Sequence, residues 1–556
     1  MGSDKQSERG PFESGAITPR PSSINHTLPR ESSENTLQTS IDDADSDRNR
    51  TEDSMERINS KLGQQEGDDP EKDAEALESS GIQDASPLKD PNLVEWDGPA
   101  DPDNPVNWSL AKKWYITMML ALVTFCVTFS SSIFSQATGV TAELYGVSTE
   151  VTTLATSLVV LGFGLGPLVW GPLSELYGRM IPLFTGFAIF VIFQIPVATA
   201  QNLHTIMICR FLIGAFGCAP LAIIGGAMTD FWDPVARGVA VALFAGATFI
   251  GPIAGPIAGG FIVNSHLGWR WTAWVTLIIS ASFGIVGVFT VPETYAPVIL
   301  QRRAARLRRE TRNWALHSTL DEHRPTMSDI VTKYLSRPLQ MLVLEPILLL
   351  VTIYLSIIYG ILYLFFFAYP ISFQEVRGWK NPGVAALPFI GLFAGIICGC
   401  VLIIYLTKTR FAHKMKKHGR VIPEERLPPM IIAGVSLPAG LFWFSWTSKP
   451  EISWVAQTFA GVPIGLGIIV IFLQGLNYLI DVYLMYTNSA FAANTLVRSA
   501  FGAAFPLFAT QMYHKLGVEW AGSLLGFLTA AMIPVPLLFY MYGKKIRAKS
   551  RFVPKL

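Results

Sequence analysis

The sequence has few cysteines and lacks the short motifs that mark nucleotide hydrolysis or metal-dependent catalysis. There is no P-loop GxxxxGK[ST], no HExxH and no evident nucleophile–base pair. The five cysteines lie inside apolar runs, without the spacing of a metal site or of a secreted disulfide framework: Cys126, Cys209, Cys218, Cys398 and Cys400. We therefore expect no enzyme activity, no cofactor, no metal, no disulfide and no nucleic-acid partner.

Charge is scarce in the long apolar runs and concentrated outside them. The first 100 residues carry 23 acids and 10 bases, whereas the remainder carries 19 acids and 33 bases. So polar a segment, with few aromatics, cannot bury enough apolar surface to offset its chain entropy. Residues 1–100 are therefore predicted to be a disordered acidic tail. No apolar signal-peptide core lies near Met1, so we do not expect the tail to be a cleaved leader.

Twelve apolar runs follow between residues 114 and 542, each close to the length of about 20 residues that crosses a bilayer. Six precede a polar, basic interval at residues 293–340 and six follow it. This pattern predicts an all-α membrane protein with twelve transmembrane helices. It gives an N-terminal set at 101–292, a central loop at 293–340, a C-terminal set at 341–545 and a tail at 546–556.

The lysines and arginines indicate the orientation. The loops that include Arg179 and Arg237 hold 24 Lys and Arg residues, most of them in 302–337, 408–426 and 544–555. The alternate loops hold five. The positive-inside rule then places the basic loops and both termini in the cytoplasm.

A short polar break, GPLSELYGRMIPL, separates two apolar runs at residues 171–183. Glu175 and Arg179 are four residues apart and share one helical face, which leaves a pairable carboxylate and guanidinium at a membrane surface. A charge pair at such a joint can act as a latch between helices that move.

Two arginines lie within apolar runs. Arg210 opens RFLIGAFG, and Arg498 lies in NTLVRSAFGAAFPLF. A charge inside the hydrocarbon region is costly and usually faces a cavity or a partner. The alternative for Arg210 is snorkelling to the near surface, because it lies only some five residues into its run.

The string FIGPIAGPIAGGFI spaces glycines four residues apart and interleaves prolines. Small residues at that spacing let helix backbones approach, and prolines bend a membrane helix. This favours a kinked, dry helix interface that serves function, with static close packing as the alternative. The residues are Gly251, Pro252, Gly255, Pro256 and Gly259.

An aromatic face lies on the seventh run. Tyr359, Tyr363, Phe366 and Phe367 share one side of the expected helix and could stack a flat organic ligand. Packing on neighbouring helices or lipid is an equal alternative.

These motifs together resemble the major facilitator superfamily. GPLSELYGRMIPL is similar to its loop signature between spans two and three, with Glu175 where aspartate is usual. RFLIGAFG resembles its fourth-span signature, with Arg210 at the position linked to proton coupling, and GPIAGPIAGG resembles its antiporter motif. PETYAPVIL, PEERLPP and NYLIDVYLMYTNSAFAANTLVRS are similar to the twelve-span fungal drug:proton antiporter branch of multidrug and polyamine exporters.

The resemblance implies the major facilitator fold, two six-helix bundles that rock about a midplane site. It implies that Glu175, Arg179 and Asp230 form a cytoplasmic latch. The residues we assign to transport or coupling are Arg210, Glu175, Arg179, Asp230, Asp481 and Arg498. The residues expected to line the cavity are Phe125, Phe129, Tyr359, Tyr363, Gln474 and Asn477.

The sequence predicts a monomeric, multi-pass plasma-membrane exporter that moves a small organic compound outward against protons. No acid lies near the centre of any run, which disfavours a polyvalent cation and favours a neutral, aromatic or weakly anionic drug, toxin or secondary metabolite. The alternatives are a polyamine exporter and an uncoupled facilitative transporter.

Overall fold

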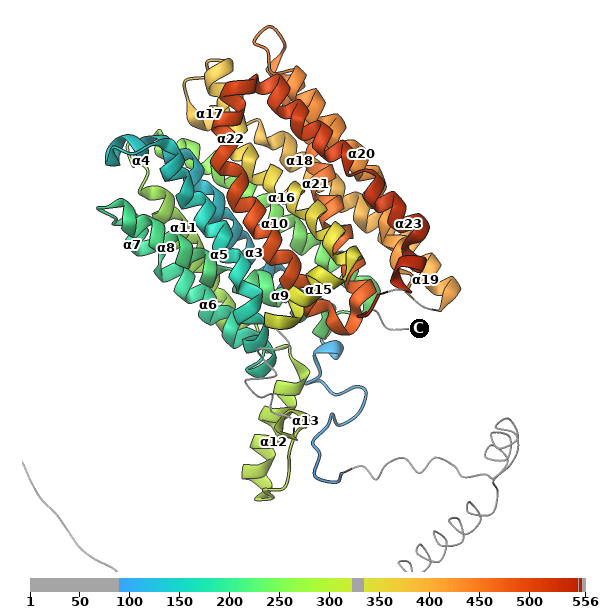
Figure 1. Ribbon diagram of the computed structural model, residues 1–556. Coiled ribbons are helices and arrows are strands. Elements are labelled where there is room, and N and C mark those ends of the chain that lie inside the picture. Colours follow the sequence, from blue (N-terminus) through green and yellow to red (C-terminus); the bar gives the residue numbers. More distant parts are fainter. Residues whose placement is uncertain (1–89, 323–334, 420, 549, 553–556) are drawn as a thin grey trace, which may run out of the picture. The chain divides into compact units, whose positions relative to one another are not determined.

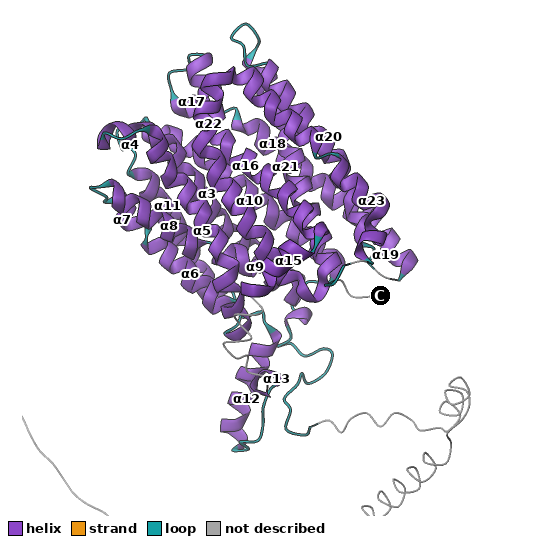
Figure 2. Ribbon diagram, viewed as in Figure 1, coloured by secondary structure: helices purple, strands orange, loops and turns teal. Residues whose placement is uncertain are grey.

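The computed structural model describes residues 90–322, 335–419, 421–548 and 550–552. This part of the chain is a bundle of long helices joined by short loops (Figures 1 and 2). Its only β pairing is an isolated bridge between Leu93 and His317. The all-α prediction is confirmed, whereas most of the predicted tail, residues 1–89, lies outside the described residues.

The N-terminal half is built from apolar helices, several of which begin at a polar cap. Ser109 accepts a hydrogen bond from the backbone of Lys112 and starts α3, and Asn202 does the same for α8. The helices are α3 (Leu110–Ile133), α4 (Thr138–Tyr145), α5 (Thr149–Leu176), α6 (Met180–Ile192), α7 (Gln194–Ala198), α8 (Leu203–Gly217), α9 (Ala219–Phe231), α10 (Pro234–Val263) and α11 (Trp271–Thr290).

The C-terminal half repeats this plan after the central loop. The loop carries α12 (Ala296–Thr311) and α13 (Thr319–Glu322). The helices that follow are α15 (Arg337–Leu344), α16 (Pro346–Pro370), α17 (Pro382–Ala386), α18 (Phe389–Leu406), α19 (Ala412–His418), α20 (Leu427–Trp446), α21 (Trp454–Tyr483), α22 (Thr487–Ala531) and α23 (Pro534–Arg547).

Within the described residues, eleven helical stretches are long and apolar enough to cross a membrane. The last runs from Thr487 to Arg547, 61 residues, which is far more than the ~20 needed for one crossing. Its backbone breaks at Gly517, where φ is 74° and ψ is 165°, a conformation that favours glycine. The break divides this stretch into two crossings, which gives the predicted twelve.

The two halves meet along specific helix pairs, and the larger core cluster includes residues of α5 and α10 as well as the helices of the C-terminal half. One core cluster joins residues of α3, α5, α6, α8, α9 and α11, and another centres on α16 and the helices around it. Across the halves, α5 packs on α22 and α10 packs on α18 and α17.

The central loop projects from the end of the bundle opposite α17 (Figure 1). There the segment before α3 clasps α12, since Asp97 and Asp101 both pair with Arg303. The backbone N–H groups of Asp97 and Asp103 and the Arg303 guanidinium lower the pKa of Asp101 to about 2. The clasp therefore holds the start of the first long helix against the middle of the chain.

Candidate functional site

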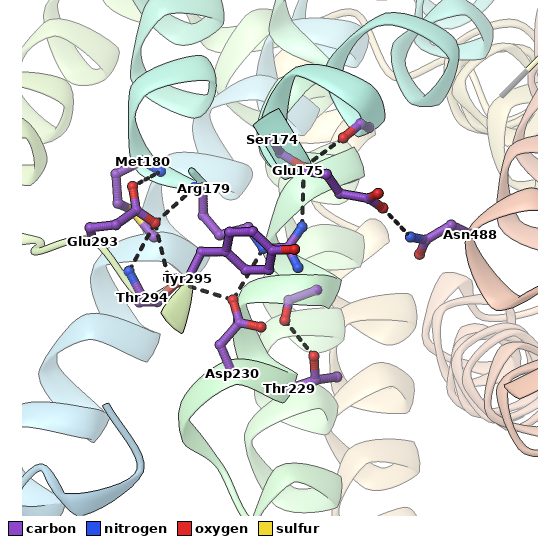
Figure 3. Close-up of polar contacts among 12 residues, drawn as sticks. Ser174, Glu175, Arg179, Met180, Thr229, Asp230, Glu293, Thr294, Tyr295 and Asn488 are labelled. Atoms are coloured by element: carbon purple, nitrogen blue, oxygen red, sulfur yellow. Dashed lines mark hydrogen bonds and ion pairs between the residues drawn. The ribbon is translucent and has the colours of Figure 1, made fainter. Parts of the chain in front are cut away.

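The predicted latch residues meet at the end of the bundle that carries α12. The Nε of Arg179, just before α6, lies 3.1 Å from the Oδ2 of Asp230, near the end of α9 (Figure 3). Arg179 also donates from Nη1 to the hydroxyl of Ser174 and lies 4.5 Å from the ring centre of Tyr295. Both partners of the pair are largely buried, at 12% side-chain exposure each. The structure thus brings together two of the three residues predicted for the latch.

A further carboxylate, Glu293, completes this cluster and was not predicted. It accepts hydrogen bonds from the backbone N–H groups of Arg179 (2.8 Å) and Met180 (3.2 Å), the first donors of α6. A carboxylate at this position accepts from N–H groups that have no partner within the helix, and its negative charge interacts favourably with the positive end of the helix dipole. Gly178 has a φ of +91° and lies against this carboxylate, so any larger residue would displace it. Glu293 lies in the motif PETYAPVIL, but only the fold shows that this segment packs back onto GPLSELYGRMIPL.

Glu175 makes a contact between the two halves. Its Oε1 accepts a 2.7 Å hydrogen bond from Nδ2 of Asn488, at the start of α22 (Figure 3). Arg179 pairs with Asp230 within the N-terminal half, and Glu175 accepts from Asn488 across the halves. This geometry links the latch directly to the boundary that would have to open.

The C-terminal half contains a matching arginine–aspartate pair. The sequence predicted a role for Asp481 but not for its partner. Arg426, just before α20, donates from Nε to Oδ2 of Asp481, near the end of α21, at 2.8 Å. Arg547, at the end of α23, bonds Glu424 at 2.7 Å. As in the first half, an arginine before one helix binds an aspartate at the end of the following long helix. Asp481, predicted to act in transport, is therefore the counterpart of Asp230.

Arg210 is buried and binds backbone groups of the N-terminal half. Its exposure is 2%, and its Nε and Nη1 donate to the carbonyls of Ala155 (3.0 Å) and Ser130 (2.9 Å). Its Nη2 is buried without a partner. The side chain does not snorkel, because it bridges α5 and α3 inside the bundle instead. Its guanidinium carbon also lies 4.9 Å from the ring centre of Phe134, so carbonyl dipoles and a ring face hold this buried cation.

The glycine string of α10 faces α3. A side chain at Gly251 would overlap Thr128, one at Gly255 would overlap Ser132, and one at Gly259 would overlap the carbonyl of Ile133. α10 continues as one helix through Pro252 and Pro256. The predicted close helix interface is therefore present, and it lies within the N-terminal half.

The predicted aromatic face lies at the centre of the molecule. Tyr363 and Ser131 share a 2.9 Å hydrogen bond that crosses the halves, and the ring centres of Tyr359 and Tyr363 are 5.0 Å apart. The guanidinium carbon of Arg498 lies 4.9 Å from the ring centre of Tyr359 and 4.8 Å from that of Phe472. Arg498, Tyr359 and Phe472, which we call the central triad, come from α22, α16 and α21.

The remaining residues predicted to line a cavity have mixed environments. Phe125 is partly exposed and stacks on Phe129 at 5.7 Å. Gln474 is buried with its Oε1 unpaired, and Asn477 is partly exposed. A separate apolar groove runs between α5, α8 and α22, lined by residues such as Leu161, Phe211 and Leu496. It contains none of the residues predicted for the cavity.

Known proteins resemble the chain in fold and in sequence. The family profile of the Major Facilitator Superfamily matches residues 120–506. The solved structure of the proton:xylose symporter XylE, 14% identical, aligns with a TM-score of 0.56 over 79% of this chain and 96% of its own. At that identity the match supports the fold alone. The chain belongs to the major facilitator superfamily, a family of transporters, and it is a multi-pass membrane protein.

The more similar relatives are fungal. The citrinin biosynthesis cluster MFS transporter mrr1 of Monascus ruber is 64% identical over 83% of this chain and 93% of its own length. The ascochitine biosynthesis cluster MFS transporter of Didymella fabae is 57% identical over 87% and 95%. The cercosporin MFS transporter CTB4 of Cercospora nicotianae is 47% identical over 84% and 90%. The chain is therefore a transporter related to those of secondary-metabolite clusters.

Proposed function

We propose that the protein exports a small organic secondary metabolite across the plasma membrane, driven by protons that move inward. The observation that carries the proposal is that each half contains an arginine–aspartate pair and that a further contact joins the two halves. Arg179–Asp230 and Arg426–Asp481 tie helix ends within each half, whereas Glu175–Asn488 ties the halves to each other. Contacts that hold one end shut and can break are what alternating access requires.

We propose proton coupling on the basis of the acids in the two latches and of a buried arginine. Asp230 and Asp481 are acids held next to arginines at the ends of long helices, and Arg210 is a buried cation without an acidic partner among the described residues. Protonation of an acid in such a pair weakens its ion pair, which links proton uptake to the opening of that end. We further propose that both termini and α12 face the cytoplasm, in line with the distribution of basic residues, and that the protein acts as a monomer.

The cargo is proposed by analogy with the relatives and by the chemistry of the centre. The relatives' names associate them with citrinin, ascochitine and cercosporin. Aromatic side chains of α16 and α21 meet at the boundary between the halves, which suits a flat organic molecule. Polyamine export remains the second candidate, although no described acid contacts the central triad to hold an ammonium group.

Inside-out membrane vesicles test this function. Vesicles acidified inside are expected to accumulate citrinin when they contain the protein, and a protonophore is expected to abolish the accumulation. Vesicles from cells without the gene serve as the control. Accumulation that survives the protonophore would instead support uncoupled transport, and accumulation of spermidine but not of citrinin would support the polyamine exporter.

A further inference from the structure

Arg498 holds a positive charge at the boundary between the halves with nothing described to neutralise it. It lies well inside α22, between the rings of Tyr359 and Phe472. Both rings are buried, at 9% and 7% exposure, so the guanidinium faces the interior and not the lipid. Arg498 itself is partly exposed.

The hydrogen-bonding capacity of Arg498 is unused. Its Nε is buried without an acceptor, and within the described part of the chain its guanidinium makes no hydrogen bond and no ion pair. A guanidinium carries five N–H donors in a planar fork. The two rings favour a cation through their faces, but a ring face does not replace an in-plane acceptor. A cation within a membrane helix whose Nε is buried without an acceptor is costly, and such a cation typically marks a functional site.

The neighbouring polar groups do not neutralise the charge. The Tyr359 hydroxyl donates to that of Tyr363 at 3.5 Å, and Tyr363 is engaged with Ser131. The centre therefore combines a planar cation with aromatic walls.

We infer that Arg498 is the recognition residue for an anionic group on a planar aromatic cargo. A carboxylate would accept two parallel hydrogen bonds from the guanidinium, while the aromatic body of the same molecule would pack against Tyr359 and Phe472. This inference rests on the proposed export function and narrows it to aromatic acids.

Binding to the purified, full-length protein in detergent tests the inference with 2-naphthoate and its neutral analogue 2-naphthamide as probes. The wild type is expected to bind the acid at least about tenfold more tightly than the amide, since only the acid pairs with the arginine. Arg498→Gln should remove this preference, and Arg498→Lys should keep part of it, because lysine keeps the charge but loses the fork. Arg302→Gln, an exposed change of equal charge on α12, is the control.

The outcomes separate this inference from the proposed function. Equal binding of acid and amide by the wild type, an unchanged preference in Arg498→Gln, or no binding of any acid in a panel of aromatic carboxylates would each overturn the inference. Citrinin accumulation is measured in parallel in acidified vesicles from the same cells that supply the purified protein. Loss of that accumulation in the wild type would refute the export function itself.

Discussion

At the scale of single residues, the arginines divide into those that pair with an aspartate near a helix end and those that place a positive charge inside the bundle. Arg179 and Arg426 each find an aspartate, whereas Arg210 and Arg498 lie deeper and contact carbonyls or rings. Surface ion pairs contribute little to stability, but partly buried pairs with several hydrogen bonds contribute more. The latches are therefore expected to control opening, and the inner arginines to control what passes.

The Arg179–Asp230 pair should behave as one unit. Arg179→Ala and Asp230→Ala are each expected to lower vesicle transport about tenfold, and the double variant should be no worse than the poorer single variant. The reason is that each single change already breaks the 3.1 Å pair. Initial uptake rates, normalised to protein amount, measure the effect. Multiplicative losses in the double variant would show that the two residues act independently.

Arg210→Ala is expected to abolish transport while the protein still reaches the membrane. The change removes the buried charge and its hydrogen bonds to the Ala155 and Ser130 carbonyls, and a hydrogen bond from a charged group contributes about 1.5–3 kcal/mol. Immunodetection and thermal unfolding in detergent measure expression and stability, and vesicle uptake measures transport. Arg377→Ala is the matched control, because Arg377 also donates to backbone carbonyls, but its partners Ile452 and Thr447 are in the C-terminal half. Normal uptake by Arg210→Ala would refute a role in transport.

At the scale of helices and segments, close approach decides which positions tolerate change. α10 lies so near α3 that a Cβ at Gly255 would also come within 2.8 Å of the Ile133 nitrogen. The sequence predicts that these glycines form an interface, since their spacing is visible in one dimension. It does not reveal the partner helix, because the spacing is the same whichever helix packs against it.

Gly255→Val is expected to impair both folding and transport. The added side chain must displace Ser132 and the backbone of α3, which neighbours cannot accommodate. Gly225→Ala, on α9, is the control because nothing lies within 4 Å of its Cβ. Ser132→Ala combined with Gly255→Ala should recover part of the loss by removing the hydroxyl that collides. Thermal unfolding midpoints and vesicle uptake measure the outcome. A fully active Gly255→Val would show that the interface between α10 and α3 can accommodate a larger side chain.

The clasp between the segment before α3 and the central loop should loosen as the pH rises. The hydrogen bond to the Ala315 carbonyl, with the carboxylates of Glu322 and Asp90, raises the pKa of His317 above its ordinary value of 6.5. A raised pKa in the folded state means that the stabilisation is complete below pH 6.5 and is lost as the pH passes the folded value. Loss of the positive charge leaves two carboxylates facing a neutral ring.

Amide hydrogen exchange measures this loosening. Between pH 6 and 8, after correction for intrinsic rates, the amides of Val94 and His317 should lose protection, because they form the bridge between the two segments. The amides of Asp97 and Asp103, bonded to Asp101, are the internal control, since a carboxyl with a pKa of about 2 stays ionised throughout this range. His317→Asn should abolish the pH dependence, and equal behaviour of both pairs of amides would contradict the role of the histidine.

At the scale of the whole molecule, the two halves repeat one design. The arginine–aspartate latch occurs once in each half, and a carboxylate–backbone or carboxylate–arginine contact braces it, Glu293 in the first half and Glu424 with Arg547 in the second. The sequence predicts the helices, their number and the residues of the first latch, because apolar length and motif spacing are local properties. The partners Glu293, Arg426 and Asn488 lie far away along the chain, so only the fold brings them together.

If the halves rock about the central triad, locking either end should stop transport. At the end near α12, Glu175→Cys with Asn488→Cys replaces a contact of 2.7 Å. At the opposite end, Phe261→Cys with Gly383→Cys lies where the Phe261 ring covers Gly383 (α10 and α17, Figure 1). The exposed native Cys398 is first replaced by Ala so that it does not compete for the cross-linker. A short bifunctional thiol cross-linker should block vesicle uptake in each pair and leave each single cysteine variant active. A reducible cross-linker followed by dithiothreitol should restore the rate. Because transport by alternating access requires both ends to open in turn, continued uptake by a fully cross-linked pair would rule out rocking about this boundary.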